Sequence, residues 1–400
     1  MTAPDARPAN TVVVWAASIV IVSGALASAR VSWRHAALFM TGVLAGVVLY
    51  RAAFGFTSAW RVLVSDRRSA GVRAQMLMLA MACVVFIPLL AMRGPVLGMA
   101  LRGSIAPVGV AGLIGAFLFG LGMQLGGGCA SGTLYTSGGG SIRMLVVLAF
   151  FIVGSVVGTA HAPYWDAAPS LGSISLVERF GPMGALGASL AVFALITAIT
   201  GRLEQARHGR VASLAARPSS QRTWLSGPWP LLWGAIGLVL VNLATLLLAG
   251  RPWGVTSAFA LWGAKTAQAA GVNVASWPYW AVPARTQLLK APVLTDVTTV
   301  MDLGIMLGAL AAAGMAGRFG PQWRVPVKSL AAAIVGGLLL GYGARLASGC
   351  NIGAFFSGVA SGSLHGWVWF VAAFTGTVVG TRLRPSFGLI VERTAGRAGG

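Results

Sequence analysis

Two cysteines that directly follow glycine are the residues of this sequence best suited to chemistry. Cys129 follows Gly128, and Cys350 follows Gly349. Glycine permits positive φ and weakens a helix, so we expect the helices to break here and expose backbone amides beside a thiol. Amides at the start of a following half-helix favour an anion, and a thiol adds a weak hydrogen-bond donor. We therefore predict that both Gly-Cys pairs and Asn351 lie on the path of an anionic substrate. The alternative is that the glycines serve close helix packing and the cysteines are small buried hydrophobes.

Hydroxyl side chains occur at matching places in two further segments. Thr57-Ser58 lies within residues 54–60, and Thr256-Ser257 lies at the same place within residues 253–259. These hydroxyls could bind an oxyanion, or they could bond back to the preceding helical turn. The sequence leaves both interpretations open.

Charged and amide side chains also fall inside apolar stretches. Arg345 lies shortly before Cys350, and Gln124 occupies the matching position before Cys129. A charge in the middle of a membrane span costs about 3 kcal/mol or more, so it usually marks a pathway or a paired structural site. We predict that Arg345 and Gln124 belong to the pathway, with a structural pair as the alternative for Arg345. Asp302 is the one acidic candidate for coupling a proton or cation, unless it simply lies near a helix start.

Apolar stretches long enough to cross a membrane must position these residues. The chain is 56% hydrophobic and 9% charged, whereas a soluble domain carries about 25% charged residues. Windows of about 20 apolar residues predict ten membrane-spanning helices. They lie near residues 11–29, 36–54, 74–92, 105–125, 143–162, 183–200, 231–249, 297–316, 329–347 and 366–381. We predict an all-α membrane protein with short re-entrant helices at the Gly-Cys and Thr-Ser-Ala motifs.

Matching segments in the same order indicate that the chain consists of two repeats. The Thr-Ser-Ala segments match, as do the Gly-Cys segments and the helix ends at 156–159 and 378–381. If each repeat holds five spans, an odd number, the second enters the membrane from the opposite side, as in many transporters with inverted repeats. We assign residues 1–201 to the first repeat, 202–230 to a basic cytoplasmic linker with the lead-in of the second repeat, and 231–400 to the second. The span at 183–200 is an alternative member of the second repeat.

The basic residues indicate the orientation. The net charge is +21, and Lys and Arg gather in loops rather than in one polar domain, which argues against nucleic-acid binding. Basic loops stay on the cytoplasmic side, so we predict a multi-pass protein of the bacterial inner membrane with both termini in the cytoplasm. The first apolar run resembles a signal peptide, but Arg7 before it is offset by Asp5. We therefore expect a retained helix.

Catalytic and metal motifs are absent from the sequence. Three cysteines do not make a disulfide framework, and no HExxH, CxxC or paired-carboxylate arrangement occurs. We therefore predict a protein that is not an enzyme and uses no cofactor, metal or catalytic residue. Cys83 lies mid-span without glycine or polar neighbours and is expected in the core. The alternatives are a membrane thiol-redox protein that uses Cys129 and Cys350, and a structural or assembly subunit.

The motifs resemble those of the YeeE/YedE family of sulfur-transport permeases, the thiosulfate uptake proteins of bacteria. The resemblance covers nearly the whole chain and is most specific in residues 127–133 and 348–367. It implies an hourglass-shaped bundle in which cysteines near the pore centre, here Cys129 and Cys350, hand thiosulfate inward through transient S–H···S contacts. Family members with a third pore cysteine carry it beside the first Thr-containing motif, where this sequence has Gly55-Phe56-Thr57. The relay would then be shorter.

The sequence thus predicts an inner-membrane permease that imports thiosulfate or a related sulfur-containing anion through a central pore. The polarisable sulfur of the substrate would meet neutral thiols, while half-helix amides offset its charge and binding stays weak enough for release. A small cytoplasmic sulfur-carrier protein would suit the basic inner loops as a partner, although topology alone also explains these loops.

Overall fold

Long helices make up most of the computed structural model, which describes residues 8–92, 94–216 and 227–392. They are α1 (Thr11–Ala29), α2 (Trp33–Ala52), α4 (Ala70–Ala91), α5 (Val110–Gly126), α7 (Ile142–Ala160), α9 (Leu176–His208), α10 (Leu231–Ala249), α14 (Val297–Met315), α15 (Val327–Leu346) and α17 (Leu364–Leu383). Within the described ranges, nine helical stretches are long and apolar enough to cross a membrane, and α17 holds the tenth expected window. The prediction of an all-α membrane protein is confirmed.

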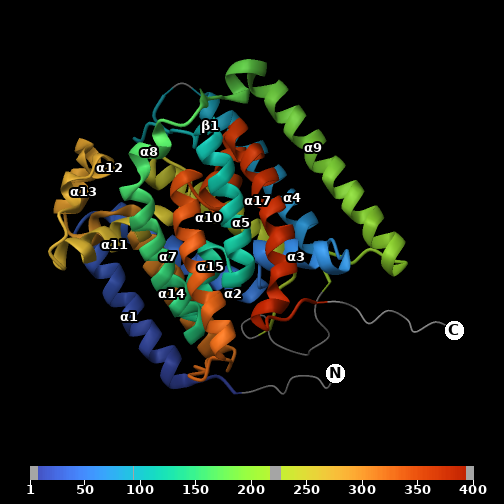
Figure 1. Ribbon diagram of the computed structural model, residues 1–400, viewed down its shortest axis with the longest axis horizontal. Helices are drawn as coiled ribbons and strands as arrows, with labels where there is room; N and C mark the ends of the chain where they lie inside the picture. The colour runs from blue at the N-terminus through green and yellow to red at the C-terminus, as the bar shows by residue number, and fades with distance from the viewer. Residues whose placement is uncertain (1–7, 93, 217–226, 393–400) are drawn as a thin grey trace.

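One end of the bundle carries a small antiparallel ribbon of β1 (Pro107–Gly109) and β2 (Ser170–Ser173). The short helices α8 (Ala162–Asp166), α12 (Pro278–Ala281) and α13 (Pro283–Lys290) lie toward the same end, which we call the ribbon face (Figure 1). At the opposite end, which we call the terminal face, α1 begins and α17 ends. The expected start of the fourth span at residue 105 is wrong. The chain is not helical before Val110, because Pro107 lacks an amide donor and β1 pairs with β2.

The interior consists of helices that approach one another very closely. α2 packs on α14, α5 on both α15 and α17, and α7 on α15, whereas α1 and α9 lie on opposite flanks (Figure 1). Glycine makes these approaches feasible. A Cβ at Gly120 would lie 1.9 Å from the carbonyl oxygen of Ala373, and one at Gly341 would lie 2.1 Å from that of Phe151. Small residues of this kind let helix backbones meet in a membrane.

Helix contacts that involve the first half have counterparts in which the matching helices of the two halves change places. α1 packs on α14 just as α9 packs on α4, and α7 packs on α15 just as α17 packs on α5. Two matching halves would produce this exchange. The inverted relation of the halves, the domain boundaries and the side on which the termini lie stay predictions.

Short helices begin at all four motifs. They are α3 (Phe56–Asp66), α6 (Ala130–Gly138), α11 (Thr256–Ala269) and the π-helical turn η3 (Asn351–Phe356), which continues into α16 (Ser357–Ala360). Before α6, Gly127 has a φ of 90°, and before η3, Ser348 and Gly349 have φ values of 54° and 143°. Each cysteine then caps the next helix with extended backbone. The helices therefore break at both Gly-Cys motifs, as the glycines predict.

The connecting segments complete the described chain. The 3-10 turns η1 (Val274–Ser276), η2 (Val293–Thr295) and η4 (Arg384–Phe387) join the helices of the second half and end α17. α9 continues to His208, so residues 202–208 of the expected linker are helical. Residues 217–226 of that linker, and Asp5 and Arg7 before α1, lie outside the described residues.

Candidate functional site

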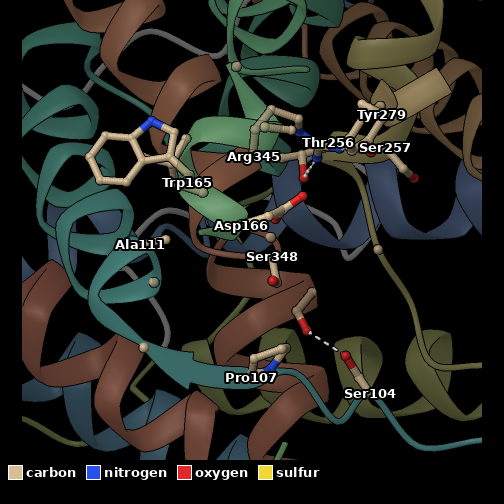
Figure 2. Close-up of a pocket in the computed structure, with 18 of the residues that line it drawn as sticks. Ser104, Pro107, Ala111, Trp165, Asp166, Thr256, Ser257, Tyr279, Arg345 and Ser348 are labelled. Atoms are coloured by element: carbon tan, nitrogen blue, oxygen red, sulfur yellow. Dashed lines mark hydrogen bonds between the residues drawn. The ribbon is translucent and has the colours of Figure 1, made fainter. Parts of the chain in front are cut away.

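A cavity of about 600 Å³, here called the large cavity, opens at the ribbon face. β1, α8, the segment before α11, and the end of α15 supply its walls (Figure 2). Its polar lining residues are Ser104, Trp165, Asp166, Ser170, Arg251, Thr256, Ser257, Tyr279, Arg285, Arg345 and Ser348. Three of these side chains are cationic and one is anionic, so the cavity favours an anion.

Arg345 projects from the last turn of α15 toward the start of α11. Its Nη2 donates to Thr256 Oγ1 at 2.8 Å and its Nη1 to Tyr279 Oη at 3.3 Å. Tyr279 also holds Arg285, whose guanidinium carbon lies 3.9 Å from the ring centroid. Figure 2 shows Arg345, Thr256 and Tyr279 grouped on one wall. Within the described chain Arg345 forms no ion pair, so its charge remains available to an anion.

Arg251 forms a second cationic group beside the first. Its Nη2 donates to Thr298 Oγ1 at 3.0 Å, and Ser257 Oγ donates to the same oxygen at 3.0 Å. Thr298 lies at the start of α14. The start of α11 is thus held between two arginines, one at Thr256 and one near Ser257.

Cys350 lies directly behind the large cavity. Its neighbours Gly349 and Gly353 line the cavity, whereas Cys350 and Cys129 are 0% and 2% exposed. α6 packs against η3, and the two thiols are close enough to interact electrostatically. All three cysteines, including Cys83, are free. The fold therefore brings together two cysteines that are far apart in sequence, with Cys350 next to the large cavity.

Cys129 takes part in the cap of α6. Its Sγ accepts from the Gly132 amide at 3.4 Å and lies 3.4 Å from Ser131 Oγ, while Thr133 Oγ1 donates to the Cys129 carbonyl at 2.9 Å. Backbone amides therefore converge on this thiol, where the helix dipole is positive. Cys83 lies elsewhere, in the core on α4, where its thiol donates to the Val359 carbonyl at 3.6 Å. Its expected place in the core is confirmed.

Gln124, Thr57 and Ser58 do not line the large cavity. Gln124 Nε2 donates to the Thr57 carbonyl at 3.1 Å, and both residues are buried. Ser58 and Gly55 line a second cavity of about 250 Å³, here called the small cavity, near the starts of α4 and α10. Ser58 therefore lies at the small cavity, and Gln124 joins its neighbour Thr57 from the end of α5.

Several buried polar atoms of the predicted site residues have no hydrogen-bond partner among the described residues. They are Arg345 Nε, both amide atoms of Asn351, Thr57 Oγ1 and Gln124 Oε1. Buried polar groups are normally satisfied, so a run of exceptions usually marks a place where a ligand or water binds. Arg345 Nε, Asn351 Nδ2 and the Thr57 hydroxyl can donate to an anion, whereas the amide oxygens of Asn351 and Gln124 can only accept a hydrogen bond.

Arg251, Arg285 and Tyr279 are cavity residues that the sequence analysis did not select. Arg251 directly precedes the Thr256 motif, so its position was a usable signal. Arg285 and Tyr279 lie in the segment between α11 and α14, and only the fold places them beside Arg345.

The family relationship agrees with this arrangement. A family model described as "Sulphur transport" matches residues 51–379, which include both cysteines and both Thr-Ser-Ala motifs. The chain belongs to the sulphur transport family. Residues 1–50, which include α1 and all of α2 except its last two residues, and residues 380–400, from the last turn of α17 onward, lie beyond the matched range.

Named members of the sulphur transport family resemble the chain to different extents. The probable transporter YedE of Escherichia coli strain K12 is 33% identical over 177 residues, so the match spans 43% of this chain and 42% of that relative. The thiosulfate transporter TsuA of Spirochaeta thermophila is 27% identical over 353 residues, 82% of this chain and 92% of its own length. TsuA of Escherichia coli strain K12 is 26% identical over 281 residues, 66% and 71% of the two chains.

Proposed function

We propose that this chain imports thiosulfate, or a closely related sulfur-containing anion, across the bacterial inner membrane. The observation that carries the proposal is that Cys350 lies directly behind a cavity with three arginines, while Cys129 caps the helix that packs beside it. Relatives named as thiosulfate transporters support the substrate class. The anion would cross unchanged, so the protein acts as a transporter rather than an enzyme.

The large cavity would capture the anion. Arg345 and Arg251 each bond to neutral hydroxyls, so both can add a charge-assisted hydrogen bond to an oxyanion without breaking an ion pair. Arg285 is held against the Tyr279 ring, which fixes its direction. Captured here, the anion lies beside Gly349 and Gly353, next to Cys350.

The thiols would then carry the anion between the cavities. A neutral thiol offers a weak hydrogen bond, and the polarisable sulfur of thiosulfate is a suitable acceptor. Weak binding at Cys350 and then at Cys129 favours passage, because a tight site would retain the anion. The amides at the start of α6 would offset its charge at Cys129.

Thr57 and Gln124 would form the far end of this path. The buried hydroxyl of Thr57 has no partner in the described chain and could receive the anion where relatives with three pore cysteines have the third thiol. The small cavity at Ser58 would lead to the terminal face, which we place in the cytoplasm. A small sulfur-carrier protein would accept the anion there.

Growth on thiosulfate tests the proposal. A sulfur-starved host without its own uptake systems should grow on thiosulfate as sole sulfur source when this chain is supplied. Cys129→Ala and Cys350→Ala should abolish that growth. Cys83→Ala is the matched control, because it removes a buried thiol that lies away from both cavities, and it should still support growth. The proposal is wrong if the wild type gives no growth, or if Cys129→Ala and Cys350→Ala grow as well as Cys83→Ala and the wild type.

A serine exchange separates transport from helix capping. Cys129→Ser keeps a side-chain acceptor for the Gly132 amide, whereas Cys129→Ala loses a cap worth on the order of 1 kcal/mol. If the thiol serves transport, both variants should take up radiolabelled thiosulfate poorly while the serine variant melts like the wild type. Normal uptake by the serine variant would show that Cys129 is only a cap.

A further inference from the structure

A buried carboxyl lies between the large cavity and α6, the helix that Cys129 caps. Asp302 on α14 is 0% exposed, and neither of its oxygens has a hydrogen-bond partner in the described chain. A charged carboxylate placed there would lose its hydration and receive no donor in return, which is costly unless a proton or cation neutralises it. Such residues within membrane spans are usually functional.

The position of Asp302 on α14 connects it to both parts of the path. Thr298, Asp302 and Met306 are spaced four residues apart and share one face of the helix. Thr298 bonds to the cavity residues Arg251 and Ser257. The Met306 carbonyl lies so close to Gly138 of α6 that a Cβ there would be 2.2 Å from its oxygen. Asp302 is thus one turn from the cavity and one turn from the helix that Cys129 begins.

The charges that act on Asp302 are few. They come from Asp296 at the start of α14 and Arg251 at the cavity. The neutral thiol of Cys350 lies close enough to be affected by a charge on Asp302. Asp296 is already engaged, because its Oδ2 accepts from the amide and hydroxyl of Thr299 at 2.8 Å each.

Titratable groups on the other helices packed against α14 interact with groups other than Asp302. On α2, Arg34 and His35 bond to the Leu97 and Thr295 carbonyls, and Tyr50 and Arg51 act on each other and on Arg318. On α11, Lys265 donates to two carbonyls, and on α6, Tyr135 interacts with Cys129 and Tyr50. None of these contacts compensates a charge on Asp302.

We propose that Asp302 is a proton-binding site coupled to the passage of the anion. This inference rests on the proposed function. A divalent anion beside Cys350 would be repelled by an ionised Asp302 and tolerated by a neutral one, so the anion and the proton favour each other's binding. A proton needs only one carboxylate oxygen. A metal cation needs several ligands, and the described residues contain no cluster of three or more His, Cys, Asp or Glu side chains.

Uptake into proteoliposomes under an imposed pH gradient tests the coupling. With the outside acidic, wild-type uptake of labelled thiosulfate should rise, by up to about tenfold per pH unit for one coupled proton. Asp302→Asn, which is always neutral, should still exchange labelled for unlabelled thiosulfate but should not respond to the gradient. Asp302→Glu should retain the response.

Two controls keep the outcomes distinct. Asp296→Asn removes an acid from the same helix that already has partners, so it should keep the gradient response. A Na⁺ gradient replaces the pH gradient in a parallel series. A response to Na⁺ alone, an unresponsive wild type, or a fully responsive Asp302→Asn would overturn the proton site. If wild-type liposomes show no thiosulfate exchange at all, the proposed function itself fails.

Discussion

Arg345 donates a hydrogen bond of 2.8 Å to the hydroxyl of Thr256. At the matching positions of the other half, Gln124 donates one of 3.1 Å to the carbonyl of Thr57. Matching residues therefore join the end of a long helix to the start of a short one in both halves. The pairs differ in charge, because only the one at the large cavity carries a cation. An anion that enters there would be attracted first by Arg345 and would later meet the neutral Gln124–Thr57 pair, which holds it less tightly and so favours release.

Loss of the Arg345 charge should weaken substrate capture. We expect Arg345→Gln to raise the KM for thiosulfate uptake by about tenfold or more, because a hydrogen bond to a charged group contributes about 1.5–3 kcal/mol. The KM of Arg345→Lys should fall between those of the wild type and Arg345→Gln, since lysine keeps the charge without the planar guanidinium. Arg179→Gln is the control, as it removes an exposed cation from the start of α9. Equal KM values for both glutamine variants would contradict a role in capture.

The segment after α17 should loosen in acid. Arg61 donates to Glu392 through Nε at 2.7 Å and Nη2 at 2.6 Å, and Arg384 donates to the Ile390 carbonyl. The Arg61 guanidinium lowers the pKa of Glu392 below its ordinary value. A lowered carboxyl pKa means that the ion pair stabilises the fold above the unfolded value and is lost as the pH falls through the lowered pKa.

Hydrogen exchange measures this loosening. The amides of Gly388 and Leu389, which donate to the Pro385 and Arg384 carbonyls, should be protected at pH 7 and should lose protection, after correction for intrinsic rates, as the pH falls below the ordinary carboxyl range. In Glu392→Gln, which lacks the ion pair, these amides should already show at pH 7 the weaker protection that the wild type shows in acid. Protection that depends on neither pH nor this substitution would show that the ion pair does not hold the segment.

Helix packing at Gly120 should tolerate no side chain. Its Cβ would lie 1.9 Å from the Ala373 carbonyl oxygen, a backbone atom that cannot move aside cheaply. We expect Gly120→Ala to lower the free energy of unfolding by about 3 kcal/mol. Gly187→Ala on α9 is the matched control, because nothing lies within 4 Å of its Cβ, and it should gain up to about 1 kcal/mol of helix stability. Denaturant titration in detergent compares the two, and equal effects would refute the packing argument.

Much of the helical framework is predictable from the sequence. The length and apolarity of a span depend on the thickness of the bilayer, so all ten windows overlap long helices. The helix breaks at Cys129 and Cys350 are also predictable from the neighbouring residues, since glycine weakens a helix at its own position. The prediction failed at residues 105–109, because pairing of β1 with β2 depends on a distant segment.

The composition of the site was decided by the tertiary structure. Sequence identified Cys129 and Cys350 as a matched pair, but only the packing of α6 on η3 places their thiols together. Tyr279 and Arg285 lie in a connecting segment with no apolar period or repeat, so no local pattern could place them beside Arg345. Helix breaks depend on neighbouring residues, whereas a cavity depends on side chains that converge from remote parts of the chain. For that reason the sequence by itself determined the helices and their breaks, whereas the tertiary structure decided which residues line the cavity.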